Sequence, residues 1–246
     1  MSASLLSVTE LTVAYGGVIA NDAVSFEMPD AAITGLIGPN GAGKTSMIDA
    51  LSGYTRPTGG QVVFRGDDIT RRATHWRARH GLSRTFQSVE LFDDLTVREN
   101  LLTAREQVAG RWWKRDTAAD DDVARALALT GLEAVAHRRP SGLSLGQRKL
   151  VGVARALAQR PRLVLLDEPA AGLDSDESAE LGLRLRALAD DGVGILLVDH
   201  DMGLVLSICD QVMVLDFGRL ISTGPAVQIR EDPAVIAAYL GSETTA

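Results

Sequence analysis

The chain has 246 residues, 46% of them hydrophobic, which is enough to bury a substantial core in one domain. Its formal net charge of −7 argues against a general basic surface, so we expect no nucleic-acid partner. The one cysteine, Cys209, cannot form an internal disulfide, which favours a reducing compartment. Because we find no signal peptide and no apolar run of ~18 residues, we expect a cytoplasmic protein.

The first third of the chain is predicted to be rich in β-strands. We expect strands over Leu5–Tyr15 and Asn21–Met28, separated by a glycine pair, and a buried strand over Ile33–Ile37. A Pro-Thr-Gly-Gly turn precedes a further strand at Gln61–Phe64.

A glycine-rich loop joins the strand Ile33–Ile37 to a helix predicted over Thr45–Leu51. The loop reads Gly38-Pro39-Asn40-Gly41-Ala42-Gly43-Lys44-Thr45, with Ser46 directly behind it. This is the pattern GxxxxGK(S/T), whose backbone N–H groups surround phosphate oxygens at a helix N-terminus. Lys44 would reach the terminal phosphates and the Thr45 hydroxyl would ligate Mg²⁺. The sequence therefore predicts a nucleoside triphosphate site.

The segment from Leu91 to about Gln147 differs in composition from the rest. It is rich in Ala, Leu, Arg and Asp, with apolar residues at roughly helical spacing. We interpret it as a mostly helical lobe inserted into an α/β core. Inside it, Trp112 and Trp113 lie in a charged stretch that predicts an exposed loop. These tryptophans either pack partly against the protein or touch a partner or membrane surface.

The second half of the chain alternates strands and helices, as expected for a parallel sheet covered on both faces. The expected strands are Leu163–Leu166, Ile195–Val198, Gln211–Leu215 and Arg219–Ser222, the last two meeting at Gly218. The expected helices are Glu177–Ala189, Met202–Ile208 and a short tail over Pro233–Leu240.

The apolar strand Leu163–Leu166 ends in two carboxylates, Asp167 and Glu168. Asp167 suits Mg²⁺ coordination through water, because Mg²⁺ keeps most of its hydration shell. Glu168 can orient and deprotonate an attacking water, a role that contributes about 10²–10⁴-fold. The pair could instead cap the turn before Pro169, but capping does not explain two charges beside a phosphate site. The guanine-reading NKxD pattern of a GTPase is absent.

A third motif, Leu143-Ser144-Leu145-Gly146-Gln147, is close to the LSGGQ signature of ABC-type ATPases. The order of phosphate loop, Gln87, signature, Asp167-Glu168, Asp174 and His200 resembles that family along essentially the whole chain. The resemblance implies an α/β fold with a P-loop NTPase (RecA-like) core, an antiparallel β-subdomain and an inserted helical subdomain. The nucleotide-binding domain would then span 1–246, with 91–147 as the helical insert.

The resemblance also implies roles for single residues. Tyr15 would stack on adenine, unless it is an ordinary core tyrosine. Gln87 would contact Mg²⁺ and link the site to the helical lobe, since an amide both donates and accepts. His200 would hydrogen-bond the γ-phosphate and hold the water and Glu168 in place. Asp174 would lie at a dimer seam.

The signature residues Ser144, Gly146 and Gln147 act in trans in this family, on the γ-phosphate held by the opposite subunit. Leu145 stands where the family consensus has glycine. The rate of ATP hydrolysis at a site shared between two subunits that includes this leucine stays open.

Longer sequence segments resemble those of the ATPases of branched-chain amino acid importers. They are Leu91–Asn100, Asp167–Leu173, His200–Val205 and the tail from Asp232 to Gly241. This resemblance implies ATP and Mg²⁺ as cofactors, and a position on the inner face of the plasma membrane. The implied partners are a second ABC ATPase subunit, an integral permease and, indirectly, a solute-binding protein. Importers of urea or short amides, lipopolysaccharide exporters and soluble iron–sulfur assembly ATPases remain as alternatives.

Overall fold

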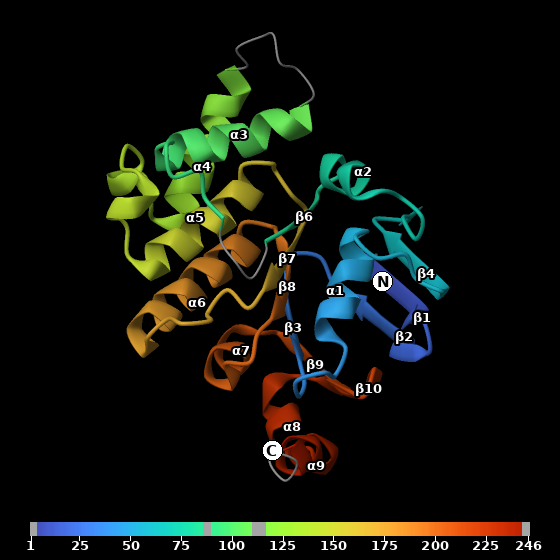
Figure 1. Cartoon of the computed structure of the whole chain (residues 1–246). Coiled ribbons are helices and arrows are strands. Elements are labelled where there is room, and N and C mark those ends of the chain that lie inside the picture. Colours follow the sequence, from blue (N-terminus) through green and yellow to red (C-terminus); the bar gives the residue numbers. More distant parts are fainter. Residues whose placement is uncertain (1–3, 86–89, 110–116, 243–246) are drawn as a thin grey trace.

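The structure, a computed structural model, describes residues 4–85, 90–109 and 117–242. Two β-sheets form the framework of this part of the chain (Figure 1). The strands are β1 (Leu6–Tyr15), β2 (Val18–Met28), β3 (Ile33–Ile37), β4 (Gly59–Phe64), β5 (Asp67–Asp68), β6 (Leu82–Arg84), β7 (Leu163–Asp167), β8 (Gly194–Val198), β9 (Gln211–Asp216) and β10 (Arg219–Gly224). The α-helices are α1 (Lys44–Ser52), α2 (Thr74–Arg79), α3 (Val97–Ala109), α4 (Thr117–Thr130), α5 (Leu145–Leu157), α6 (Ser175–Asp190), α7 (Met202–Ile208), α8 (Ala226–Glu231) and α9 (Pro233–Ser242). Short 3₁₀ turns occur at Glu133–Val135 and Pro140–Gly142.

The central sheet has six strands in the order β10-β9-β3-β8-β7-β6. The strands from β9 to β6 are parallel, and β10 pairs antiparallel with β9. Every residue of β3, β7 and β8 is buried, as continuous apolar runs in a doubly covered parallel sheet require. This arrangement brings the carboxyl ends of β3, β8 and β7 side by side.

Two hydrophobic clusters cover opposite faces of this sheet. Val164 and Leu166 of β7 pack in the cluster that includes residues of α3–α9, whereas Leu163 and Leu165 pack with α1 and the second sheet. This alternation follows from the two-residue period of a strand. Figure 1 shows α1 with β1, β2 and β4 on one side of the central sheet and α5 and α6 on the other.

The second sheet is antiparallel, with four strands in the order β2-β1-β4-β5. The fold therefore confirms the predicted α/β core with an antiparallel β-subdomain. β2 begins at Val18 rather than Asn21, because pairing with β1 continues to the Tyr15↔Val18 pair at the turn. The short elements β5, α2, β6 and α8 were not predicted, since none is long enough to show a clear periodicity.

The expected helical lobe is represented by α3, α4 and the 3₁₀ turns that follow them. α5 begins at Leu145 and continues to Leu157, past the expected end of the lobe at Gln147. The division at 91–147 therefore stays a prediction. The stretch with Trp112 and Trp113 lies outside the described residues. No helix in the part of the chain described here is long and apolar enough to cross a membrane.

Candidate nucleotide site

The phosphate loop runs between β3 and α1 with almost no room for side chains at two of its glycines. A Cβ atom on Gly38 would lie 2.1 Å from the carbonyl oxygen of Leu215, and one on Gly43 would lie 2.3 Å from that of Ala20. The β9–β10 turn also braces the loop, because Gly218 N–H donates to the carbonyl of Ala42 at 3.0 Å. The loop is therefore shaped by close backbone packing, as a phosphate cradle requires.

Lys44 begins α1 and is folded back over the loop. Its Nζ donates to the carbonyl oxygens of Gly38 at 2.6 Å and Pro39 at 2.9 Å, and the residue is only 9% exposed. Burial lowers the pKa of Lys44, while the charges of Glu168 and Asp167 oppose that shift. The ammonium group is thus held at the mouth of the cradle, where it can bind phosphate oxygens. Thr45 beside it is exposed.

Asp167 is the last residue of β7 and is nearly buried. Burial raises the pKa of Asp167, and a hydrogen bond from Arg84 opposes the rise. Among the described residues, no three His, Cys, Asp or Glu side chains gather into a ready metal cluster. A hydroxyl from Thr45 and a carboxylate from Asp167 still fit Mg²⁺, which prefers oxygen ligands and keeps several waters.

Glu168 adopts a backbone conformation that is unusual for a residue with a side chain. Its φ is +47°, in the left-handed region, and its N–H donates to the carbonyl of Val198 at 2.7 Å. Its own carbonyl accepts from Lys149 Nζ at 3.5 Å. Strained conformations persist only when their surroundings fix them, and they concentrate at functional positions. This geometry supports a special role for Glu168 without assigning one.

Asp199 holds the segments that follow β7 and β8 together by hydrogen bonds. No role for it was predicted from the sequence. Its carboxylate is fully buried and accepts from the backbone N–H of Ala170 at 3.0 Å, His200 at 2.8 Å and Asp201 at 3.0 Å. The neighbouring His200 ring is 63% exposed, with Nδ1 3.7 Å from Asp199 Oδ1. Asp199 therefore fixes the backbone while the imidazole projects toward solvent.

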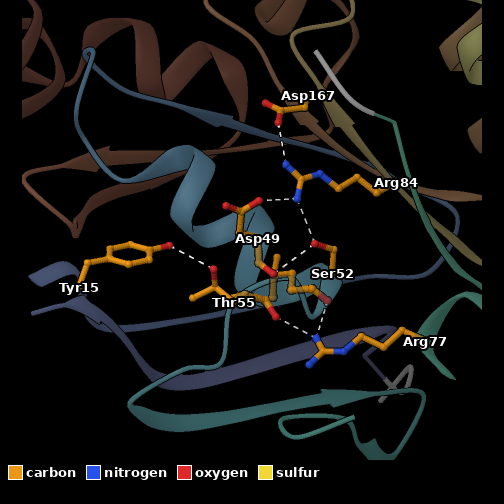
Figure 2. A network of polar contacts seen from close by, with 9 residues as sticks. Tyr15, Asp49, Ser52, Thr55, Arg77, Arg84 and Asp167 are labelled. Carbon is orange, nitrogen blue, oxygen red and sulfur yellow. Dashed lines mark hydrogen bonds and ion pairs between the residues drawn. The ribbon is translucent and has the colours of Figure 1, made fainter. Parts of the chain in front are cut away.

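A polar network behind the phosphate loop was also missed (Figure 2). Arg84 bridges Asp49 of α1 and Asp167 of β7. Arg77 donates from Nη1 to the carbonyls of Ala50 at 2.9 Å and Leu51 at 2.6 Å, at the C-terminal end of α1. A cation at that end of a helix satisfies free carbonyls and complements the helix dipole. The helix behind the loop is therefore held at several points.

Tyr15 lies at the edge of this network rather than in the core. The residue is 48% exposed, and its hydroxyl hydrogen-bonds Thr55 Oγ1 at 3.2 Å (Figure 2). An exposed ring face is compatible with stacking on a base, and adenine stacking by Tyr15 stays a prediction.

The signature segment begins α5 with a capping box. Ser144 Oγ accepts from Gln147 N–H at 3.2 Å, and Gln147 Oε1 accepts from Ser144 N–H at 3.1 Å. Glu177 of α6, to which sequence reasoning gave no role, lies against this end. Its Oε1 accepts from Ser144 Oγ at 3.2 Å and from Gly146 N–H at 3.3 Å. Leu145 is 48% exposed.

The structure thus separates the predicted site residues into two groups. The phosphate loop, Asp167, Glu168 and His200 follow the adjacent strands β3, β7 and β8 and meet at one edge of the sheet. Ser144, Gly146 and Gln147 are organised by α5 and Glu177 instead. Asp174 is the N-cap of α6, accepting from Asp176 and Glu177 N–H, so its role at a seam stays a prediction. Gln87 lies outside the described residues.

Known proteins share both the sequence and the fold of this chain. The family described as ABC transporter matches residues 21–171, and the one described as branched-chain amino acid ATP-binding cassette transporter matches residues 219–244. Two high-affinity branched-chain amino acid transport ATP-binding proteins, BraF of Pseudomonas aeruginosa and LivG of Escherichia coli K12, are each 38% identical over 98% of this chain and 99% of their own length.

A solved structure shows the same fold. The ADP conformation of an ATP-binding cassette of an ABC transporter has a TM-score of 0.87 and 27% identity, covering 97% of this chain and 99% of that one. These matches confirm the resemblance derived from the motifs. The chain therefore belongs to the ABC transporter family and is one of its ATP-hydrolysing, ATP-binding subunits.

Proposed function

We propose that this ATPase powers the uptake of branched-chain amino acids, or of similar small amino acid or amide solutes, through a partner permease. The observation that carries the proposal is full-length similarity to branched-chain amino acid transport ATP-binding proteins, reinforced by the separate match at residues 219–244. That tail lies outside the catalytic motifs, so its match reflects more than a shared ATPase activity. The subunit would act on the inner face of the plasma membrane.

The geometry supports a specific division of labour at the nucleotide. Backbone N–H groups of the loop and the ammonium of Lys44 bind the phosphates. Bound Mg²⁺ would neutralise phosphate charge, with Thr45, Asp167 and Gln87 as the residues that would hold it. Glu168 orients and deprotonates the attacking water, and His200 holds the γ-phosphate. Tyr15 supports the adenine ring.

A second subunit completes the site in this proposal. The signature of one protomer would face the γ-phosphate held by the other, and Asp174 would lie at the seam between them. ATP binding can drive closure only if the closed pair binds ATP more tightly than the open one. Hydrolysis then removes that preference, and the pair opens.

A groove beside β6 supports contact with a permease. It has a volume of about 250 Å³ and is lined by Tyr54, just after α1, and by residues of α2 and β6, including His75, Arg79 and Arg84. Tyr54 is 59% exposed there. Because Gln87 follows β6 closely in sequence, a membrane subunit docked in this groove would be linked to the nucleotide site. The lipopolysaccharide-export and non-transport alternatives have less support than the importer.

The test is ATP turnover in vesicles that hold this subunit, its sister ATPase and candidate permeases. We expect leucine-loaded binding protein to stimulate turnover and to drive solute into the vesicles. Stimulation by a lipid-export permease alone, or full coupling to a soluble assembly complex, would overturn the importer proposal. Testing urea-loaded and amide-loaded binding proteins in parallel separates the solute classes.

A further inference from the structure

Arg84 is a buried cation that no motif assignment explains. It ends β6, which pairs in parallel with β7, and its side chain is only 8% exposed. Burying a guanidinium is costly unless its charge is paired and its N–H groups are bonded. The identity of its partners therefore indicates what the residue is for.

The described hydrogen-bond partners of Arg84 include residues on both elements that build the predicted Mg²⁺ site. Nη2 donates to Asp167 Oδ2 at 3.0 Å, and Nη1 donates to Asp49 Oδ1 at 2.5 Å and to Ser52 Oγ at 3.1 Å (Figure 2). Asp49 and Ser52 belong to α1, the helix that begins with Lys44. One guanidinium thus joins the helix behind the phosphate loop to the carboxylate at the end of β7.

The two carboxylate oxygens of Asp167 differ in their hydrogen bonding. Oδ2 is held by Arg84, while Oδ1 accepts no hydrogen bond from the residues that the structure describes. A carboxylate tied through one oxygen keeps a fixed orientation and retains its other oxygen for a hydrated cation. Asp49 in turn holds the arginine, and its carboxylate is 27% exposed compared with 10% for Asp167.

We propose that Arg84 is a positioning residue for the Mg²⁺–nucleotide site, fixing the Asp167 carboxylate against α1 so that Oδ1 would stay available to hold Mg²⁺ through water. This inference rests on the proposed role of Asp167 in Mg²⁺ binding. Under this proposal, removing Arg84 lowers the affinity for Mg²⁺. A residue that only joined β6 to α1 would affect stability and not Mg²⁺ affinity. Groups that orient metal ligands typically change metal affinity by about 10–100-fold when they are removed.

The experiment compares Arg84→Met and Arg84→Lys with wild type in two measurements. The first is the Mg²⁺ concentration that gives half-maximal ATP turnover. The second is the affinity for a fluorescent ATP analogue, measured in Mg²⁺ and again in EDTA. We expect Arg84→Met to raise the Mg²⁺ requirement about tenfold and to leave affinity in EDTA within about twofold. Arg84→Lys should be intermediate, because an ammonium cannot bridge two carboxylates as a planar fork does.

Arg77→Lys is the matched control, since Arg77 also binds α1 but its side-chain hydrogen bonds in the described residues go to backbone carbonyls. It should lower the thermal midpoint without moving the Mg²⁺ requirement. If Arg84→Met does not fold, Asp49→Asn provides the test, because it loosens Arg84 and should shift the Mg²⁺ requirement in the same direction. An unchanged Mg²⁺ requirement in the folded variants would overturn the inference. Mg²⁺-independent turnover by the wild type would instead count against the proposed function.

Discussion

The two halves of the proposed composite site are held in different ways. In the half that contains the phosphate loop, Lys44 and Asp167 are at most 9% exposed and bond to other elements of the same chain. In the signature half, Ser144 and Leu145 are exposed, and the donors of Ser144 and Gly146 are bonded to one carboxylate, that of Glu177. The phosphate-loop half is held by contacts across the fold. In the signature half, the donors of Ser144 and Gly146 are bonded to a single side chain.

Regulation can therefore act on the signature half. A cradle built from backbone packing at Gly38 and Gly43 cannot be loosened without unfolding its surroundings. The hydrogen bonds from Ser144 and Gly146 to the charged Glu177 carboxylate contribute about 1.5–3 kcal/mol each, and a competing anion can replace them. A phosphate arriving from a second subunit would compete with Glu177 for the same donors. Variants on the two halves should therefore change different observables.

The largest effect is expected at Glu168, in the half that contains the phosphate loop. Glu168→Gln keeps the size of the side chain but removes its basicity, so turnover should fall by about 10²–10⁴-fold while ATP still binds. Phosphate release under saturating ATP measures the first quantity and calorimetry the second. Glu180→Gln, on the exposed surface of α6, is the control and should leave turnover unchanged. Equal turnover in both variants would remove Glu168 from the role of general base.

Lys44→Ala should weaken ATP binding by about 10–100-fold, because a hydrogen bond to a charged group contributes about 1.5–3 kcal/mol. The loop carbonyls of Gly38 and Pro39 also lose their donor, so circular dichroism must confirm that the variant is folded. Calorimetric titration with ATP provides the measurement. An affinity within twofold of wild type would show that Lys44 serves only to close the loop.

His200→Ala should lower turnover about tenfold or more and change ATP affinity by less than about threefold. The exposed ring can be removed without disturbing the core, whereas the buried Asp199 holds three backbone N–H groups. Asp199→Asn is therefore the contrasting variant, and it should lower the thermal midpoint as well as turnover. A loss of ATP affinity in His200→Ala as large as its loss of turnover would contradict the assignment.

The smallest effect is expected in the signature half. Glu177→Gln removes a negative charge from the donors of Ser144 and Gly146, so less ATP should be needed to bring two subunits together. We expect the ATP concentration at half-maximal dimerisation to fall about fivefold, which corresponds to one hydrogen bond of about 1 kcal/mol. Light scattering on a Glu168→Gln background measures it, with Glu180→Gln as control. A higher ATP requirement would mean that Glu177 supports the signature rather than competing for it.

The sequence motifs identified candidate residues in both halves, but not the side chains that hold them in place. The phosphate loop is a local motif, and Asp167, Glu168 and His200 follow apolar strands whose carboxyl ends share one edge of a parallel sheet. Arg84 could not be assigned in this way, because it contacts Asp167, 83 residues away, through side chains alone. Glu177 and Asp199 were missed for the same reason: neither lies in a pattern whose spacing identifies its partner.

We expect ATP to join two such subunits, and the mass of the Glu168→Gln variant in solution is the decisive measurement. With ATP and Mg²⁺ the variant, alone or mixed with its sister subunit, should shift from monomer to dimer, and removing ATP should reverse the shift. Wild-type turnover per subunit should rise with protein concentration. A variant that remains monomeric with saturating ATP and both subunits present, beside wild-type turnover independent of concentration, would contradict the account.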